Sequence, residues 1–379
     1  MEIRNGCTHH ATIVIHFARN AMLKHLDWYI IKKYLGTFAL SIVLIITISV
    51  IFDFTEKIDN FLENNAPAKA IVFDYYMNFI PFFANMFTPL FAFISVIFFT
   101  SKLANNSEII AMLAGGMSFR RLMVPYLISA GIITICSFLL MSFVIPPANK
   151  IRLAFEDQYV SKFKSEVARN VQLGIEPGVI AYFERYEEGR AIGRHFSLEK
   201  FEGKQLVSRL TAQEIVMDSL YHWKVKNYLI RDFDGLYEYI QKGSELDTVI
   251  YMDPADFFIT AQEAAQMSTP KLRQYIAKQK ARGLGNTQAF LDEYYKRYST
   301  PLAAIILTLI GVSLSSRKVR GGMGINIGIG LALSALYILF TTFSSQLAIA
   351  GSVNPLLAAW TPNLLFLAVG LYLYAKAPK

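Results

Sequence analysis

Hydrophobic and polar positions divide the chain into three parts. Six apolar stretches are each close to the length of about twenty residues that crosses a bilayer as a helix. Three lie before about residue 146 and three after about residue 298. Between them, a polar stretch from about residue 147 to 266 alternates apolar and polar residues with the period of β-strands. The pattern predicts a membrane α-helical protein, with spans arranged three plus three and a jellyroll-like all-β domain inserted between them.

The apolar stretches set the expected boundaries. The fourth span is the shortest, and its helix can continue into the polar residues before it. Prolines 81, 89 and 125 fall within spans, where neighbouring helices can satisfy the freed carbonyl groups. The six spans are expected at residues 34–54, 75–99, 122–145, 298–314, 325–350 and 356–375.

Five regions follow from these spans. The first is expected to be a disordered extension, with Met22 as an alternative start and no evident cleavable signal peptide. The regions are an extension at 1–25, three spans at 26–146 with a short helix at about 105–116, a β domain at 147–266, a helical linker at 267–297, and three spans at 298–379.

The central region carries the signals of short antiparallel strands. Strands are expected at 179–183, 194–198, 214–217 and 223–230, and turn signals separate them at 187–189, 202–203 and 233–235. Such spacing is typical of a sandwich or jelly roll of about a hundred residues. A generic sensor-like β domain is the alternative, and the strand order stays open.

Charge gives the chain an orientation. It is 54% hydrophobic, only 17% charged, and has a net charge of +8. Basic residues cluster beside spans, at Lys32 and Lys33, at Arg120 and Arg121, and at 317–320, on loops that share one side. Short loops rich in Lys and Arg stay in the cytoplasm. We therefore expect both termini in the cytoplasm and the central domain outside, in the periplasm of a Gram-negative cell, and we expect no nucleic-acid partner.

The loop between spans two and three contains the sharpest local signal. Ser107 can cap a short helix, with Glu108 in its first turn. Ile109, Met112 and Leu113 then form an apolar face, and the glycines 115 and 116 end the helix. Such a helix can dock in a groove on a soluble partner or lie on lipid, and the spacing does not separate the two.

Span five combines small residues with a polar outer end. Gly324, Gly328 and Ala332 follow at steps of four, which lets helix backbones approach closely. This face can pack within the chain or against a second subunit. Ser345 lies in the polar end, which can face a head group or water.

The outer end of span one is charged. Asp53 and Lys57 can belong to a substrate entrance or to an ordinary flank in the head-group zone. Because a carboxylate facing lipid is costly, Asp53 is expected to face water or a partner.

The sequence lacks the common motifs of catalytic sites. The chain has no GxxxxGK[ST] phosphate loop, no HExxH and no GxSxG, and its two cysteines form no metal or disulfide pattern. We therefore expect no catalytic residue, metal or cofactor in this chain, and any ATP must be hydrolysed by another subunit.

Five short segments occur in a characteristic order around the three-plus-three layout. They are LDWYIIKK at 26–33, SEI at 107–109 with Gly116 and Arg120, IPPAN at 145–149, RYSTPL at 297–302 and AAWTPN at 358–363. In this order they resemble the LptF/LptG permease family, the membrane halves of the lipopolysaccharide export transporter. The resemblance extends from Leu26 to Lys376.

The resemblance implies a periplasmic β-jellyroll and a set of partners. These are a paralogous permease half, a cytoplasmic LptB-like ATPase dimer, a single-span LptC-like protein with its own jellyroll, a periplasmic bridge protein, and lipopolysaccharide as substrate. It assigns ATPase coupling to Ser107, Glu108, Ile109, Met112, Gly116 and Arg120, and the substrate path or gate to Asp53, Lys57, Gly324, Gly328, Ala332 and Ser345.

One departure from the family stands out. Some members carry lysines at the outer end of span one, whereas Asp53 and Glu56 stand in that region here beside Lys57. The rival interpretations are a receptor or anchor that transports nothing, and a membrane transferase or hydrolase, for which no convincing site residues are present.

Overall fold

The computed structural model describes residues 25–160, 167–252, 261–281, 287–316 and 322–377. The basic loop at 317–320 and the expected N-terminal extension, apart from His25, lie outside these residues.

Six long helices of the described chain are apolar enough to cross a membrane, and each coincides with one expected span. Two of them are interrupted by a single π-helical turn, which adds a residue to the turn without ending the helix. They are α2 (His25–Glu63); α4 (Met77–Asn105), preceded by α3 (Ala68–Ala70) and η1 (Ile71–Tyr76); α6 (Phe119–Leu139), continued by η2 (Leu140–Val144) and α7 (Ile145–Tyr159); α10 (Gln288–Ser315); α11 (Gly322–Ile349); and α12 (Pro355–Ala375).

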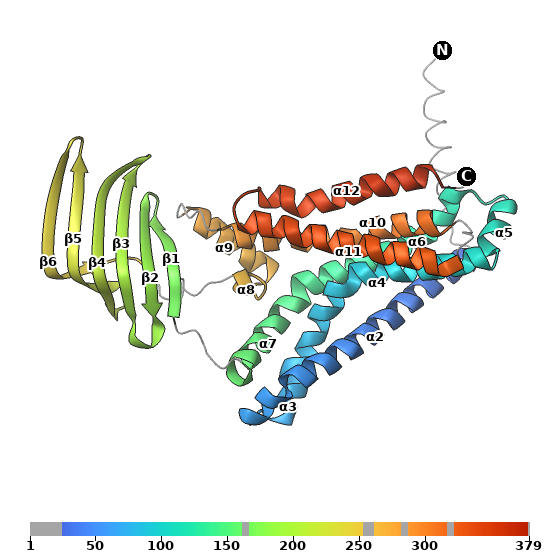
Figure 1. The fold of residues 1–379 in the computed structure, drawn as a ribbon, viewed down its shortest axis with the longest axis horizontal. Coiled ribbons are helices and arrows are strands. Elements are labelled where there is room, and N and C mark those ends of the chain that lie inside the picture. The colour runs from blue at the N-terminus through green and yellow to red at the C-terminus, as the bar shows by residue number, and fades with distance from the viewer. Residues whose placement is uncertain (1–24, 161–166, 253–260, 282–286, 317–321, 378–379) are drawn as a thin grey trace, which may run out of the picture.

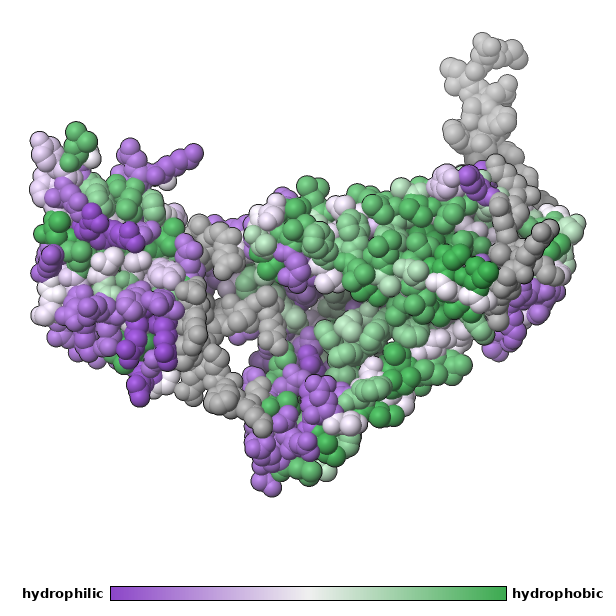
Figure 2. Space-filling model, viewed as in Figure 1, coloured by the Kyte–Doolittle hydropathy of each residue, from purple (hydrophilic) through white to green (hydrophobic). Residues whose placement is uncertain are grey.

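Helices α4 and α10 form the centre of the bundle. α4 contacts α2, α10 and α11, while α10 contacts α6, α11 and α12 (Figure 1). Burial is greatest in these two helices, and the hydroxyl of Tyr34 from α2 reaches both, at 2.8 Å from Thr308 Oγ1 and 3.2 Å from the Ala92 carbonyl. On the face seen in Figure 2, hydrophobic side chains cover the bundle, and hydrophilic ones gather on the sheet and at the ends of the helices.

Small residues allow the central helices to approach closely. A Cβ atom on Gly311 of α10 would lie 2.4 Å from Val96 Cγ1 of α4, and one on Gly330 of α11 would lie 2.2 Å from Ile97 Cδ1. Hydrogen bonds join other helices, such as the 2.6 Å contact between Ser137 Oγ and Asn85 Oδ1. Such contacts are what holds helices together in lipid, where apolar burial adds little.

The inserted region is an antiparallel sheet, as expected, and its strands follow one another in sequence order. The hairpin turns at Gly203 and Gly235 have positive φ angles of 64° and 61°, which glycine adopts without strain. In a jelly roll with Greek-key connections, some strands that are not consecutive in the sequence lie side by side. In the described sheet, each pair of neighbouring strands is consecutive in the sequence. The strands are β1 (Val167–Glu176), β2 (Val179–Glu187), β3 (Ile192–Glu202), β4 (Gln205–Ser219), β5 (His222–Asp234) and β6 (Tyr237–Val249).

One face of the sheet carries the core of the domain. Phe183, Phe196, Ala212 and Tyr228 are paired in a row across β2 to β5, and the row ends at Gly243 of β6. Trp223 is 1% exposed beside them. The four strands expected from sequence lie in β2 to β5. The sequence pattern missed β1 and β6; in β6 most side chains are exposed and few are apolar.

Candidate functional sites at the two ends of the bundle

A seven-residue helix, α5 (Glu108–Ala114), lies between α4 and α6 at the end of the bundle far from the sheet (Figure 1). Helix α2 begins and α12 ends at this same end. Gly116 follows α5 with a φ angle of +86°, and the amide of Met117 donates to the Met112 carbonyl at 3.2 Å, so the expected helix end is confirmed.

The expected side-chain cap of α5 is absent, and its apolar face packs against the bundle. Ser107 occupies the cap position in a left-handed conformation, and its side chain caps no amide; the Glu108 carboxylate instead accepts from the Asn106 side chain at 3.1 Å. Ile109 is 0% exposed, and Met112 packs on the same core, so this face is turned into the bundle. Ile110 is 50% exposed, whereas Glu108 and Met112, one turn apart on the same side of α5, are both half-buried.

The start of α6, just after α5, is fixed to the beginning of α2. Arg121 forms a bidentate ion pair with the buried carboxylate of Asp27 at the beginning of α2, with 2.9 Å between Nη1 and Oδ1. Arg120, beside it, is exposed. This ion pair holds the first turns of α2 and α6 together next to α5.

At the opposite end, Asp53 and Lys57 belong to a polar cluster that joins α2 to α7. Lys57 Nζ lies 2.9 Å from Asp53 Oδ1 and 3.0 Å from Glu156 Oε1. Arg152 contacts the same Glu156 oxygen at 3.1 Å, and the Tyr75 hydroxyl donates to Asp53 at 3.1 Å. Asp53 therefore has partners, as its burial cost requires.

This cluster changes the interpretation of Lys57. Its ammonium group is shared between two carboxylates and also lies 4.8 Å from the centre of the Tyr75 ring. An incoming phosphate would have to compete with these contacts. The sequence could not reveal Glu156 and Arg152 as partners, because they come from a helix about a hundred residues later.

The small residues of α11 lie on the outside of the bundle. Gly324, Gly328 and Ala332 are exposed, and a Cβ atom on either glycine would meet nothing within 4 Å. The close contact inside the chain falls on Gly330 instead. The chain leaves the face of Gly324 and Gly328 uncovered, which favours contact with something outside the chain.

Ser345 is tied to α10. Its hydroxyl lies 2.5 Å from Asp292 Oδ2 and 2.5 Å from Lys296 Nζ, and these two charged groups pair at 2.8 Å. The sequence indicated a polar end that faces water or a head group. The structure places Ser345, 4% exposed, against the charged pair on the neighbouring helix.

A buried arginine anchors the return from the sheet. Arg297 of α10 is 1% exposed and donates to Glu293 at 3.1 Å, to Thr269 Oγ1 at 3.0 Å and to the Ala264 carbonyl at 3.0 Å. Thr269 begins α9 (Thr269–Ala281), and Ala264 ends α8 (Ala261–Ala264). These contacts make Arg297 a link between α8, α9 and α10.

The two connections of the sheet also meet. The Asn149 side chain of α7 donates to the Ala265 carbonyl, just after α8, at 3.4 Å. The segment that enters the sheet and the segment that leaves it are therefore joined at the membrane end.

These features define a class of protein: a multi-pass membrane protein with an antiparallel β domain between two groups of helices. The model of the lipopolysaccharide export system permease family LptF/LptG matches residues 28–376. The chain belongs to this family, whose members are transporter permeases of lipopolysaccharide export. A search of the curated proteins finds no match.

Proposed function

We propose that this chain is the permease subunit that extracts lipopolysaccharide from the inner membrane and passes it to a periplasmic bridge protein. A separate LptB-like ATPase dimer would hold and hydrolyse the ATP. The observation that supports the proposal most is the family match over nearly the whole chain, together with a β domain placed at the end of the bundle opposite α5.

The proposed orientation places α5 in the cytoplasm and the sheet in the periplasm. Lys32, Lys33, Arg120 and Arg121 lie at the α5 end, and short basic segments remain in the cytoplasm. The membrane is then the inner membrane, the one in contact with a cytoplasmic ATPase.

We propose that α5 transmits movement of the ATPase to the spans. Ile109, which is buried, and Met112, which is half-buried, hold α5 against the bundle, while Ile110 is exposed and the half-buried Glu108 stands at the start of the helix. A displacement of α5 is carried to α4 and α6 because α5 lies directly between them, and the ion pair of Arg121 with Asp27 extends the connection to α2.

We propose that the exposed face of α11 lines a gate against the paralogous permease half. Gly324, Gly328 and Ala332 leave room for a helix to approach closely from outside. The polar cluster of Asp53 and Lys57 lies at the outer end of α2, where the phosphates of a lipid head group would pass. An LptC-like protein would receive the lipid on the periplasmic side.

Depletion of the chain in cells, followed by complementation, tests the proposal. Depletion should leave lipopolysaccharide in the inner membrane, and the unaltered chain should restore its delivery to the surface. Glu108→Lys should not restore delivery, because it reverses the charge on the surface that meets the ATPase. Asn105→Lys, exposed on the last turn of α4, adds a positive charge nearby and serves as the matched control.

Two outcomes would count against the proposal. Normal surface delivery in the depleted cells would favour a receptor or anchor that transports nothing. Full complementation by Glu108→Lys, at equal amounts of protein in the membrane, would exclude the role of α5 in coupling while leaving the export function in place.

A further inference from the structure

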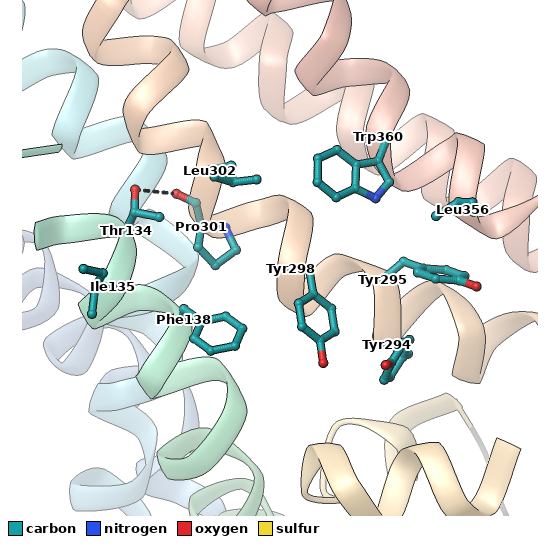
Figure 3. A pocket seen from close by; sticks show the side chains of 10 residues that line it. All are labelled: Thr134, Ile135, Phe138, Tyr294, Tyr295, Tyr298, Pro301, Leu302, Leu356 and Trp360. Carbon is teal, nitrogen blue, oxygen red and sulfur yellow. Dashed lines mark hydrogen bonds between the residues drawn. The ribbon is translucent and has the colours of Figure 1, made fainter. Parts of the chain in front are cut away.

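A cavity of about 600 Å³ opens between α6, α10 and α12 (Figure 3). Its walls are apolar and aromatic, with Phe138 from α6, Leu302 from α10 and Trp360 from α12. None of its lining residues belongs to α2 or α11, so it lies outside the proposed gate. The volume falls within the range of about 300–1,000 Å³ typical of ligand sites.

The Thr134 hydroxyl, one of the polar groups that line this cavity, is already paired. The Thr134 hydroxyl donates to the Pro301 carbonyl at 3.1 Å. The mouth is lined by Ile135, which is 61% exposed, and Leu356, which is 43% exposed. In a membrane, both side chains contact hydrocarbon, so the cavity opens toward the acyl chains of the surrounding leaflet.

Three tyrosines mark the end of the cavity that lies toward the membrane surface. Tyr294 and Tyr295 are adjacent in the first half of α10, and Tyr298 follows about one turn later (Figure 3). Tyrosine and tryptophan are enriched at the membrane–water interface, where a ring can lie in hydrocarbon and a hydroxyl in water. The cavity therefore spans from hydrocarbon to the head-group zone.

A second, polar cavity of about 450 Å³ adjoins the first, and Tyr295 lines both. Lys280 of α9 lines it, and its lining residues include no acidic side chain. Helices α10 and α12 both begin at its wall, at Gln288 and Pro355, and helix N-termini carry partial positive charge that favours phosphate.

We propose that these two cavities together bind one glycerophospholipid from the leaflet on the side of the sheet. An acyl chain occupies the apolar cavity, and the phosphate occupies the polar cavity beside Lys280. An apolar cavity next to a positively charged one matches a lipid with an apolar tail and an anionic head group. The opening at Ile135 lets the acyl chain enter sideways from the bilayer. Bound in this way, the lipid connects α6, α10 and α12 and occupies a site separate from the proposed path of the cargo.

The tryptophans of this chain provide a test. In the full chain with Trp28→Phe, Trp360 is the remaining tryptophan within the spans, and Trp223 is enclosed in the β domain. Phosphatidylglycerol with brominated acyl chains is titrated into the protein in detergent. We expect saturable quenching of Trp360. Lys280→Gln should raise the half-saturation concentration about fivefold, whereas Lys278→Gln, exposed on the same helix but outside the cavity lining, should not change it.

A second variant tests the apolar part. Ile135→Phe narrows the mouth of the cavity and should reduce the maximum quenching, with size-exclusion chromatography confirming that the protein remains folded. Quenching that never saturates, or that Lys280→Gln leaves unchanged, would overturn the proposal. Displacement of the brominated lipid by lipopolysaccharide at a lower concentration than by unlabelled phosphatidylglycerol would also overturn it, because the site would then belong to the cargo.

Discussion

Single residues matter most where charge is buried at the ends of the spans. Arg297 and Lys57 each satisfy partners on other segments, so their removal leaves buried polar groups unpaired. The cost of an unpaired buried charge exceeds the net gain of the pair itself. The effect of each residue can therefore be measured as a loss of stability.

Arg297→Gln should destabilise the purified protein by roughly 3–5 kcal/mol, because Glu293 loses its ion-pair partner and the Ala264 carbonyl loses its donor. Thermal unfolding in detergent measures the change. Arg273→Gln, on the exposed side of α9, is the matched control and should have little effect. Equal melting temperatures for the two variants would contradict the anchoring role of Arg297.

Lys57→Met should lower stability by about 2 kcal/mol, since Asp53 and Glu156 then keep their charges without the ammonium between them. Adding Glu156→Gln should recover part of the loss, because one of the two carboxylates is removed. The exposed Lys69→Met is the control. The cluster would be unimportant for stability if the single and double variants unfolded at the same temperature as the control.

At the scale of elements, glycine positions separate faces that pack within the chain from faces that do not. Gly311 meets the β-branched side chain of Val96, which has few alternative rotamers, whereas Gly324 and Gly328 meet open space. Sequence spacing favoured Gly324, Gly328 and Ala332 without showing which partner they face. Spacing reports only which residues share a helix side, and the contact depends on where the other helices lie.

Gly311→Ala should destabilise the bundle by about 1–3 kcal/mol, because the added methyl group overlaps Val96 across the contact of α4 and α10. Gly328→Ala is the matched control and should leave the melting temperature unchanged. Gly328→Leu should also fold normally but reduce lipopolysaccharide delivery in complementation assays. Normal delivery by Gly328→Leu would argue against a gate at this face.

Gly243→Ala should destabilise the β domain by about 1–3 kcal/mol. The new Cβ atom would lie 2.5 Å from Cε1 of the Tyr228 ring, which covers Gly243 on the neighbouring strand. Protease sensitivity of the domain measures the change, with the exposed Ser244→Ala as control. Resistance equal to that of the control would show that the ring can move away without cost.

At the scale of the whole molecule, the two ends of the bundle have different surroundings. α5 and the sheet lie at opposite ends of the bundle. The proposed orientation therefore predicts that a reagent outside the inner membrane reaches the sheet but not α5. In a chain with Cys7→Ser and Cys136→Ser, Leu236→Cys, at the fully exposed β5–β6 turn, should react with a membrane-impermeant maleimide added outside the inner membrane. Asn106→Cys should react only after permeabilisation. The reverse pattern would invert the topology.

The sequence by itself determined the six spans, the inserted β domain, most of its strands and the family order of motifs. These features depend on local periodicity and on the length of apolar stretches, which each segment carries independently of the others. Tertiary structure alone decided that Ile109 faces inward, that Lys57 is shared with Glu156, that Arg297 joins three helices, and that two cavities meet at Tyr295. Each of these features depends on residues that are far apart in the sequence. They come close in space only when the helices pack together.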